Sequence, residues 1–316
     1  MKAIVIDEFG GPEKLHVKEV QKPSALDSEV LVQVAYAGVN PVDRKIREGF
    51  LKERLPHVFP IILGWDVSGT VVEIGKAVKN LKVGDQIYSY IRKPVVQWGA
   101  YAEYVAIEAK HVVRKPSSLT LAESAAVPLS GLTAWQALFD NAHLKKGETV
   151  LILGGSGGVG SLAIQFAQSI GAKVIATSSP EKHDYIKKIG AQIALDHKGD
   201  LRKQLQACAK DGVDVVFDCF GKEAFQIGLD VLKKGGRMVS ILEHLDPSEA
   251  QKRGITTSYV FVQPSGPQLQ QIADLIDKKK VISQPVEEIP LKEAAAAQEK
   301  LYQGKVIGKL VLKVVG

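Results

Sequence analysis

A glycine-rich loop between an apolar segment and a helical one restricts the fold of this chain more than any other feature. The segment Thr149–Leu153 is apolar, and the loop Gly155–Gly160 that follows it matches the pattern G-x-G-x-x-G. Apolar residues at helical spacing run from Val159 to Ile170, and Lys173–Thr177 is a second apolar segment of strand length. A strand, a glycine loop, a helix and a second strand in this order are typical of a dinucleotide-binding unit.

The three glycines of the pattern have separate physical roles. Gly155 permits a tight turn, Gly157 lets a pyrophosphate approach the backbone, and Gly160 lets the helix pack closely on the strand. The first turn of the helix adds N–H groups and a partial positive charge that attract the anion. The loop residues that we expect to bind the cofactor are Gly155, Ser156, Gly157, Gly158, Val159 and Gly160.

The rest of the chain divides into parts of different character. Before about Leu121, β-branched segments bounded by Gly, Pro and Asp favour an irregular β-barrel; they are Ala3–Ile6, Val30–Tyr36 and Ser68–Ile74. After it, short apolar strands alternate with helical patterns, which favours a parallel, doubly wound sheet. The later strands are predicted at Asp214–Asp218, Arg237–Leu242 and Thr257–Val262. In the tail we expect helices at Gln268–Lys280 and Leu291–Gln303 and a last strand at Gly308–Val315.

The end of the second strand indicates which dinucleotide is bound. NAD-selective sites place Asp or Glu there, on the ribose 2′-OH. Here Ser178, Ser179 and Lys182 follow, so hydroxyls and a cation are available for a 2′-phosphate. Glu181 is nearby, but we expect it to begin the next helix and to point elsewhere. We therefore predict NADPH as the cofactor; the alternative is that the serines only cap that helix before Pro180.

Ser156 also permits a different function. With Gly154 and Gly158 it satisfies the nucleophile-elbow pattern G-x-S-x-G of serine hydrolases, for which Asp218 and His244 could complete a triad. An elbow serine does not need the additional glycines of the dinucleotide pattern, and a β-rich first part is foreign to that fold. The hydrolase is therefore the less favoured hypothesis.

Composition disfavours several classes of protein. No apolar run reaches the roughly 18–20 residues that span a bilayer, and the first residues lack the layout of a signal peptide. The only cysteines, Cys208 and Cys219, provide neither metal spacing nor a disulfide framework, which fits the cytoplasm. The formal net charge is +6, but the longest basic run, Lys278–Lys280, is read as the solvated end of a helix rather than a nucleic-acid surface.

Several segments match, in order, the landmarks of one known superfamily. They are Ala37–Asp43, Leu63–Val71, Lys82–Asp85, Gly99–Tyr104, Ala126–Trp135, Gly154–Gly160 and Gly308–Leu312. Through them the chain resembles the medium-chain dehydrogenase/reductase superfamily, particularly its zinc-free quinone oxidoreductase and enone reductase branch. The resemblance implies an α/β fold with a GroES-like β-barrel catalytic domain, residues 1–125 and 265–316, and a Rossmann NADP-binding domain, residues 126–264.

The chain departs from zinc-dependent members of that superfamily at the metal positions. The resemblance places Asn40 and Trp65 where those relatives have a Cys and a His ligand, and Leu129 near their second Cys. None of these three side chains suits zinc. The resemblance therefore implies that there is no catalytic metal.

The resemblance also implies roles for single residues. Thr133 corresponds to a threonine close to the nicotinamide, His197 to a position packing on the adenosine side, and Lys309 to a tail position close to the cofactor. The residues expected to line the nicotinamide are Phe220, Leu242, Tyr259, Val260 and Phe261. Without the resemblance, the aromatic side chains would be assigned to the core and His197 to a surface loop.

Asn40 and Asp43 are the expected catalytic residues, on the loop where relatives form the cleft. Polar groups near Asn40 could stabilise negative charge on the substrate oxygen by hydrogen bonding. The alternative for Asp43 is that it only caps a helix beginning at Arg44. Trp65 is expected either to wall the substrate pocket or to fill the volume of the absent zinc.

The expected reaction is hydride transfer from NADPH to a quinone or an α,β-unsaturated aldehyde or ketone, with the proton taken from solvent. The expected partners are this small molecule and a second copy of the chain, since in relatives the strand corresponding to Thr257–Val262 pairs across a two-fold axis. Neither a membrane nor a nucleic acid is expected. The alternative function is that of an NADPH-binding protein with a structural or RNA-binding role and little turnover.

Overall fold

The computed structural model describes residues 1–304 and 306–314, which form two compact units. Unit 1 comprises Met1–Leu129, Gln263–Lys278 and Ser283–Gly316, and unit 2 comprises Ser130–Val262 and Lys279–Ile282. The sequence predicts a catalytic domain at residues 1–125 and 265–316 and an NADP-binding domain at residues 126–264. The functions of these two domains stay predictions. Val315, in the predicted last strand, lies outside the described residues.

Unit 2 is built on six parallel strands, as the alternation of strands and helices predicts. They are β9 (Thr149–Leu153), β10 (Lys173–Ser178), β11 (Ile193–Asp196), β12 (Val213–Asp218), β13 (Leu232–Ser240) and β14 (Thr256–Tyr259). Their order in the sheet, β11-β10-β9-β12-β13-β14, confirms a doubly wound fold. In such sheets a ligand binds beyond the carboxyl ends of the strands, where the winding direction reverses, which here is between β9 and β12.

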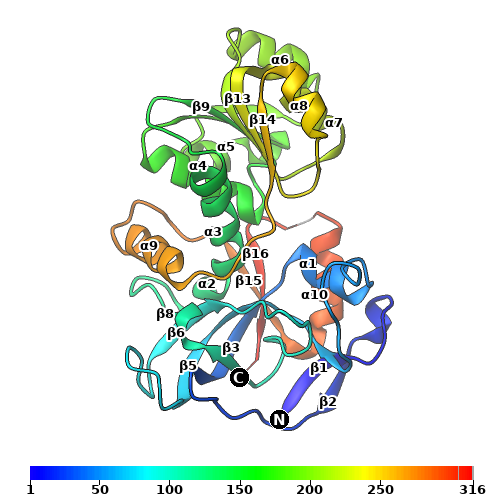
Figure 1. The fold of residues 1–316 in the computed structure, drawn as a ribbon, viewed down its shortest axis with the longest axis vertical. Helices are drawn as coiled ribbons and strands as arrows, with labels where there is room; N and C mark the ends of the chain where they lie inside the picture. The colour runs from blue at the N-terminus through cyan, green and yellow to red at the C-terminus, as the bar shows by residue number, and fades with distance from the viewer. Residues whose placement is uncertain (305, 315–316) are drawn as a thin grey trace. The chain divides into compact units, whose positions relative to one another are not determined.

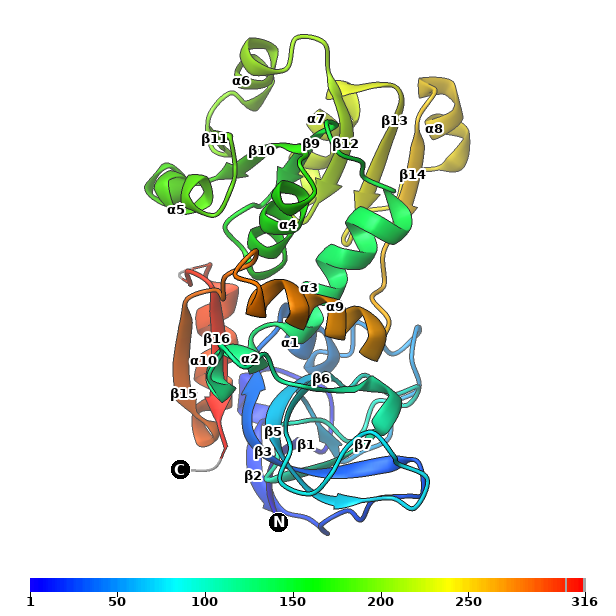
Figure 2. The same ribbon diagram turned by 90° about the vertical axis from the view of Figure 1, so that its left-hand side faces the viewer.

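Helices cover both faces of this sheet. They are α4 (Gly158–Ser169), α5 (His183–Lys188), α6 (Leu201–Cys208), α7 (Lys222–Val231) and α8 (Pro247–Arg253), with a 3-10 turn η4 (Pro180–Lys182). A further helix, α3 (Pro128–Trp135), continues into a π-helical segment η3 (Gln136–Asn141). Figure 2 shows α4 and α5 on one face of the sheet and α7 on the other. Because both faces are covered, β9 and β12 are buried along almost their whole length, which explains the apolar runs Val150–Leu153 and Val215–Phe217.

Unit 1 contains the β-rich part expected from the sequence (Figure 1). Its strands are β1 (Lys2–Ile6), β2 (His16–Glu19), β3 (Glu29–Gly38), β4 (Ile61–Ile62), β5 (Asp66–Ile74), β6 (Gln86–Tyr90), β7 (Tyr104–Glu108), β8 (Val112–Arg114), β15 (Val286–Pro290) and β16 (Lys309–Lys313). Its helices and 3-10 turns are η1 (Pro12–Lys14), α1 (Pro41–Arg47), η2 (Ala109–His111), α2 (Leu121–Ala125), α9 (Gly266–Asp277), η5 (Leu291–Glu293) and α10 (Ala294–Tyr302). The strands form a three-stranded sheet, β2-β1-β4, and a seven-stranded sheet, β15-β16-β3-β5-β6-β8, in which β7 also pairs with β3.

The strand β16 joins the tail of the chain to its first part. It lies between β15, with which it is parallel, and β3, with which it is antiparallel. In this register Val311 faces Gly38, so that β16 begins beside the residues that lead into α1. The buried apolar residues Leu310, Val311 and Leu312 fix this arrangement.

Some element boundaries differ from those predicted, for local reasons. The helix α9 ends at Asp277 rather than Lys280, and Lys279 has φ +56°, which a right-handed helix cannot contain. The strand β14 ends at Tyr259 because its last partner, Ser240, is where β13 ends. No helix in residues 1–304 and 306–314 is long and apolar enough to cross a membrane.

Candidate functional site

The turn after β9 is held by the neighbouring strand β10. Gly154 has φ +86°, a left-handed conformation that favours glycine, and its N–H donates to Oγ1 of Thr177 at 2.9 Å. The Gly155 N–H donates to the Thr177 carbonyl oxygen at 2.7 Å. The prediction that Gly155 makes the tight turn is therefore wrong by one residue. Glycine is needed at 155 for another reason, because an added Cβ would lie 2.9 Å from the Cβ of Ala176.

Gly157 and Gly160 differ in their surroundings. A Cβ at Gly160 would lie 2.2 Å from the carbonyl oxygen of Gly154, so α4 can pack on the turn only with glycine at this position. A Cβ at Gly157 would meet nothing closer than that same oxygen, at 3.5 Å, and Gly157 is exposed. The protein therefore leaves open space beside Gly157, at the first turn of α4. Helix N–H groups without intrahelical partners and the helix dipole favour an anion at such a position.

Most of the predicted cofactor-binding residues lie at the carboxyl ends of the parallel strands of unit 2. We call this end of the sheet its carboxyl edge. The glycine loop follows β9, and the other residues end or follow the remaining five strands. The residues at this edge are Gly155, Ser156, Gly157, Gly158, Val159, Gly160, Ser178, Ser179, Lys182, His197, Phe220, Leu242, Tyr259, Val260 and Phe261. Thr133 is buried on α3 in unit 2, and Lys309 belongs to unit 1.

Two aromatic side chains at this edge are in contact. The centroid of the His197 ring lies 5.3 Å from that of Phe220, with the planes at 55°. The backbone N–H of His197 donates to the carbonyl oxygen of Ser178 at 3.1 Å. Phe220 is 45% exposed and Leu242 is 39% exposed. Large apolar side chains left open to solvent at the ligand-binding edge of such a sheet are suited to cover a bound molecule.

The tip of β10 differs from the expectation in one respect. Ser178 and Ser179 are buried, the Ser178 hydroxyl donates to the Ser179 carbonyl oxygen, and the Ser179 side chain makes no capping hydrogen bond to the turn that follows. Glu181 lies in the 3-10 turn η4, and its carboxyl group is directed toward Ser179, contrary to the expectation that it points away from this site. A hydrogen bond from the Ser179 side chain, with the charges of Lys198 and Lys182, lowers the pKa of its carboxyl group. A carboxylate therefore lies among the groups expected to bind the 2′-phosphate.

Asp218 serves the fold rather than a hydrolase triad. Its Oδ1 accepts hydrogen bonds from the N–H groups of Phe220 and Gly221, at 2.9 and 2.8 Å, and its Oδ2 accepts one from Ser240 Oγ at 2.7 Å. His244 instead stacks on Tyr259, with ring centroids 4.0 Å apart. The side chains proposed for a hydrolase are thus engaged elsewhere, and the geometry does not favour that alternative.

A cluster of buried polar side chains lies at the start of α1 in unit 1, and we call it the Asn40 cluster. Its members are Asn40, Asp43, Asp66, Tyr101 and Lys309, none more than 3% exposed. Asn40 Nδ2 donates to Asp66 Oδ2 at 2.9 Å, and Lys309 Nζ donates to Asn40 Oδ1 and lies 3.7 Å from Asp66 Oδ2. Asp43 Oδ2 accepts from the Asn40 N–H at 2.8 Å and from the Tyr101 hydroxyl at 3.0 Å.

The two predicted catalytic residues, Asn40 and Asp43, are thus side by side, and Lys309 is with them. The helix α1 begins at Pro41, with Asn40 preceding it as the N-cap residue. The alternative that Asp43 caps a helix beginning at Arg44 is therefore wrong. Asp43 belongs to the first turn of α1 and binds the backbone of Asn40 from inside the helix.

Burial controls protonation in the Asn40 cluster. It raises the pKa of Asp43 to about 7, although hydrogen bonds from Asn40 and Tyr101 oppose this change. Burial also raises the pKa of Asp66, which the Lys309 charge opposes, and it lowers the pKa of Lys309. Asp43 Oδ1 is buried and has no hydrogen-bond partner. Two carboxyl groups thus share one ammonium group, and near neutral pH the cluster takes up a proton at Asp43.

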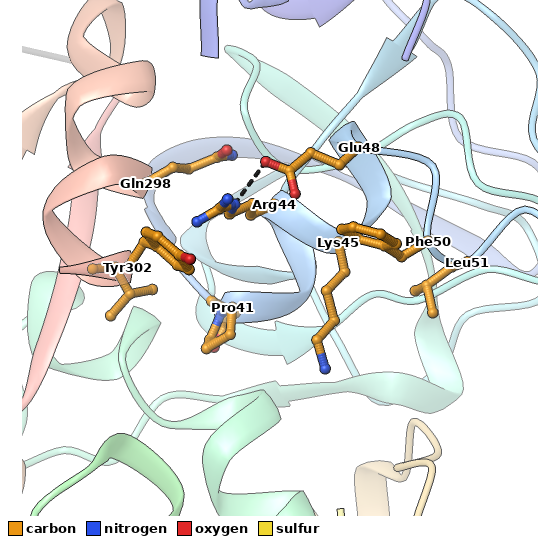
Figure 3. A pocket seen from close by; sticks show the side chains of 10 residues that line it. Pro41, Arg44, Lys45, Glu48, Phe50, Leu51, Gln298 and Tyr302 are labelled. Carbon is orange, nitrogen blue, oxygen red and sulfur yellow. Dashed lines mark hydrogen bonds and ion pairs between the residues drawn. The ribbon is translucent and has the colours of Figure 1, made fainter. Parts of the chain in front are cut away.

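A cavity of about 620 Å³ borders the Asn40 cluster. Asn40 lines it, and Figure 3 shows Tyr302 of α10 on one side of it and Phe50 on the other. Phe50 is 71% exposed and Tyr302 is 68% exposed, while the Arg44 guanidinium lies 3.4 Å from the centroid of the Tyr302 ring. The volume and the mixture of aromatic and polar side chains are typical of small-molecule sites.

Sequence reasoning did not identify Asp66, Tyr101 or Thr177 as members of these sites. Asp66 and Tyr101 do lie inside matching motifs, but no pattern indicates that their side chains meet Asn40 and Asp43. Trp65 is buried and packs edge-on against Tyr90, with centroids 6.1 Å apart, and it does not line the cavity. In the part of the chain that the structure describes, no group of three or more His, Cys, Asp and Glu side chains could hold a metal ion.

Comparison with known proteins agrees with this architecture. Residues 26–117 match the family model described as alcohol dehydrogenase GroES-like domain, and residues 158–252 match the one described as zinc-binding dehydrogenase. The chain is 33% identical to the NADPH-dependent alkenal/one oxidoreductase of Arabidopsis thaliana chloroplasts, over 99% of this chain and 79% of the relative.

Two solved structures are also similar over almost their full lengths. The quinone oxidoreductase from Coxiella burnetii has 34% identity and a TM-score of 0.88, covering 100% of this chain and 99% of that one. The Escherichia coli quinone oxidoreductase complexed with NADPH has 26% identity and a TM-score of 0.88, covering 99% and 100%. The chain belongs to the medium-chain dehydrogenase/reductase superfamily, in its quinone oxidoreductase branch. It is a quinone oxidoreductase-like enzyme.

Proposed function

We propose that this protein uses NADPH to reduce quinones or α,β-unsaturated carbonyl compounds without a metal ion. The observation that carries the proposal is the open space at Gly157, where a glycine loop and the first turn of α4 leave room for a pyrophosphate. The similarity to an alkenal/one oxidoreductase that depends on NADPH, and to a quinone oxidoreductase complexed with it, supports this cofactor and these acceptors.

The residues at the carboxyl edge of unit 2 would hold the cofactor. The glycine loop would bind the pyrophosphate, Lys182 and the serines before it the 2′-phosphate, and His197 the adenosine side. Thr133 and the residues that follow β12, β13 and β14 would line the nicotinamide. Bound NADPH supplies the hydride, so the protein has to orient the acceptor and exclude water.

Asn40 is the residue that we propose to act on the acceptor. Reduction of a quinone or an enone places negative charge on oxygen, and an N–H donor held beside that oxygen stabilises it. Asn40 lines the cavity of unit 1 and is held on both sides of its amide by hydrogen bonds. Asp43 holds Asn40 through its backbone, and the proton is taken from solvent.

The proposal that no metal takes part rests on the donor set around Asn40. Zinc in proteins is bound by thiolates, imidazoles and carboxylates, and an amide, an indole and an aliphatic side chain are not among these. The ammonium group of Lys309 already provides a cation beside Asp66, whose carboxylate accepts from the side-chain amide of Asn40. An enzyme built in this way would polarise its substrate by hydrogen bonding.

Two further expectations stay proposals. We propose a homodimer, because β14 forms an edge of the six-stranded sheet and an edge strand can pair with that of a second copy. We propose the cytoplasm as the location, because Cys208 and Cys219 are both free thiols, as in a reducing compartment.

The test is to follow the loss of reduced-nicotinamide absorbance with NADPH and NADH separately, against a panel of quinones, enals and enones. Oxidation of NADPH that depends on one acceptor class is the expected result, and it would name the substrate chemistry. Tight NADPH binding without turnover on any acceptor would contradict the proposal and favour the non-catalytic alternative.

A further inference from the structure

The partners of Asn40 determine which way its side-chain amide points. An ammonium group can only donate hydrogen bonds, so the atom that Lys309 Nζ contacts must be the amide oxygen. The carboxylate of Asp66 accepts from the other end, where Nδ2 lies 2.9 Å from Oδ2. A reversed amide would place two acceptors together at Asp66 and two donors together at Lys309. The cation and the anion therefore hold a single orientation.

Each of these partners is itself fixed to the fold. Asp66 Oδ1 accepts a hydrogen bond from the Leu129 N–H at 2.6 Å, and Lys309 Nζ also donates to the carbonyl oxygen of Val39 at 3.2 Å. Asp66 begins β5, Lys309 begins β16, and Val39 follows β3 directly. All three strands belong to one sheet, so the groups on both sides of the amide are held by paired backbone.

Asp66 takes only one of the two N–H donors on Nδ2 of Asn40. Asn40 is among the residues that line the cavity, so an oxygen atom bound there can accept from the second N–H if that N–H faces the cavity. We propose that Asp66 and Lys309 are positioning residues, which hold the Asn40 amide so that it donates to the acceptor's carbonyl oxygen. The inference rests on the proposed function and gives Lys309 a role toward the acceptor, through Asn40, rather than toward the cofactor.

The retention of a buried ion pair agrees with this role. Burying a lysine and an aspartate removes hydration that their mutual attraction does not always restore, so an apolar pair of the same size is often as stable. Here the two charges are 3.7 Å apart, with the amide of Asn40 bonded to both. An apolar pair at these positions could not orient the amide.

A double-mutant cycle tests the proposal. Asn40→Ala removes the donor and is expected to lower kcat by roughly 100-fold. Lys309→Met keeps the length of the side chain but not its charge, and we expect kcat to fall by roughly tenfold, because the amide is no longer held in one orientation. In the Asn40→Ala background, Lys309→Met should cause no additional loss in kcat, since its effect passes through the missing amide.

Control measurements separate this role from cofactor binding and from folding. The Kd of NADPH, followed by fluorescence, should stay within about twofold in Lys309→Met, whereas loss of a cofactor contact would raise it. Lys309→Gln keeps an N–H donor for Asn40 Oδ1 and should restore most of kcat. It also provides a folded, neutral comparison if Lys309→Met melts too low to be assayed.

Binding of 4-nitrophenolate to the NADP⁺ complex gives a readout without turnover, because its absorbance differs from that of the neutral phenol. An oxyanion bound by the Asn40 donor should bind roughly tenfold more weakly to both Asn40→Ala and Lys309→Met. Losses in kcat that add up in the double variant, or weaker NADPH binding in Lys309→Met, would overturn the positioning role. Turnover by the wild-type protein would still uphold the proposed function in that case. A wild-type protein that reduces no acceptor would overturn both.

Discussion

The ionisable residues with the greatest influence on this protein are those that it buries. The Asn40 cluster contains two carboxyl groups and one ammonium group, all removed from solvent. Burial outweighs the hydrogen bonds to Asp43, so the pKa of this residue rises to about 7. Its effect on stability can be separated from that of other residues, because Asn is nearly isosteric with Asp and can still accept from Asn40 and Tyr101.

The first prediction concerns the pH dependence of stability. The folded-state pKa of Asp43, about 7, exceeds its value in the unfolded chain, so folding binds a proton between these two values. Stability from this group is therefore fully present at low pH and is lost as the pH rises from about 4 to about 7. The unfolding free energy of Asp43→Asn relative to wild type should rise over this window by on the order of 3 kcal/mol, measured by urea unfolding. A pH-independent difference would contradict it.

The second prediction concerns the choice of nicotinamide at the tip of β10. Lys182 supplies positive charge there and Glu181 negative charge, and both are near Ser179. Lys182→Ala should lower the ratio of kcat/KM for NADPH to that for NADH by roughly five- to tenfold, because a charge-assisted bond to the 2′-phosphate is lost. Glu181→Gln should raise the same ratio, because it removes like-charge repulsion. Equal ratios in all three proteins would show that this turn does not contact the 2′-phosphate.

At the scale of elements, strands and helices were more predictable than the contacts between them. The strand Thr149–Leu153 was bounded correctly because its four buried residues, 150–153, form one apolar run. The position of the turn was not, because the left-handed conformation at Gly154 depends on bonds to Thr177, a residue on the next strand. The sequence likewise predicted Asn40 and Asp43 in one site but did not include Asp66. Asp66 lies beside Asn40 only because β5 pairs with β3 in the seven-stranded sheet.

The third prediction compares two glycines of one loop. Gly160→Ala should lower the unfolding free energy by about 1–3 kcal/mol, because the new Cβ would lie 2.2 Å from the Gly154 carbonyl oxygen. Gly157→Ala should leave it within about 1 kcal/mol, because φ −77° suits alanine and the added Cβ has room. NADPH binding should instead weaken roughly tenfold or more in Gly157→Ala, because the methyl group takes up space meant for the pyrophosphate.

Thermal melting with and without NADPH measures both effects together. Gly160→Ala should melt lower than wild type before any ligand is added. Gly157→Ala should melt close to wild type and gain less on adding NADPH, since ligand stabilisation depends on affinity. The prediction fails if Gly157→Ala gains as much from NADPH as the wild type does.

At the scale of the whole molecule, the order of elements identifies the superfamily, while details within unit 1 distinguish the branch. The β-rich first part and the doubly wound second part contain the segments that match the two family models, and the tail returns to the first part. Only the resemblance places Asn40, Trp65 and Leu129 at the metal positions of the zinc-dependent members, and no pattern in the sequence alone identifies these positions. The cavity beside Asn40 could not be predicted, since it depends on how α10 and the residues that follow α1 pack together.

The fourth prediction concerns metal removal. Extensive dialysis against a chelator should leave NADPH oxidation by the best acceptor unchanged within error, because Asn40, Trp65 and Leu129 offer no ligands of the kind that zinc binds. Elemental analysis of active protein should find zinc well below one atom per chain. Activity that falls on chelation and returns only with added zinc would contradict the proposed mechanism.

The place of β16 between β15 and β3 has a consequence for biosynthesis. Every residue of β16 follows all of unit 2 in the chain, while its partner β3 precedes unit 2. During translation unit 2 can complete its sheet before Tyr36–Gly38 of β3, the residues that pair with β16, have their partner strand. Pairing between segments this far apart in the chain forms slowly, so the seven-stranded sheet of unit 1 is completed only after the tail has been made, and until then its apolar surface favours aggregation. Lys309 belongs to this last strand, so the side-chain amide of Asn40 gains its hydrogen bond from Lys309 only when β16 has paired with β3.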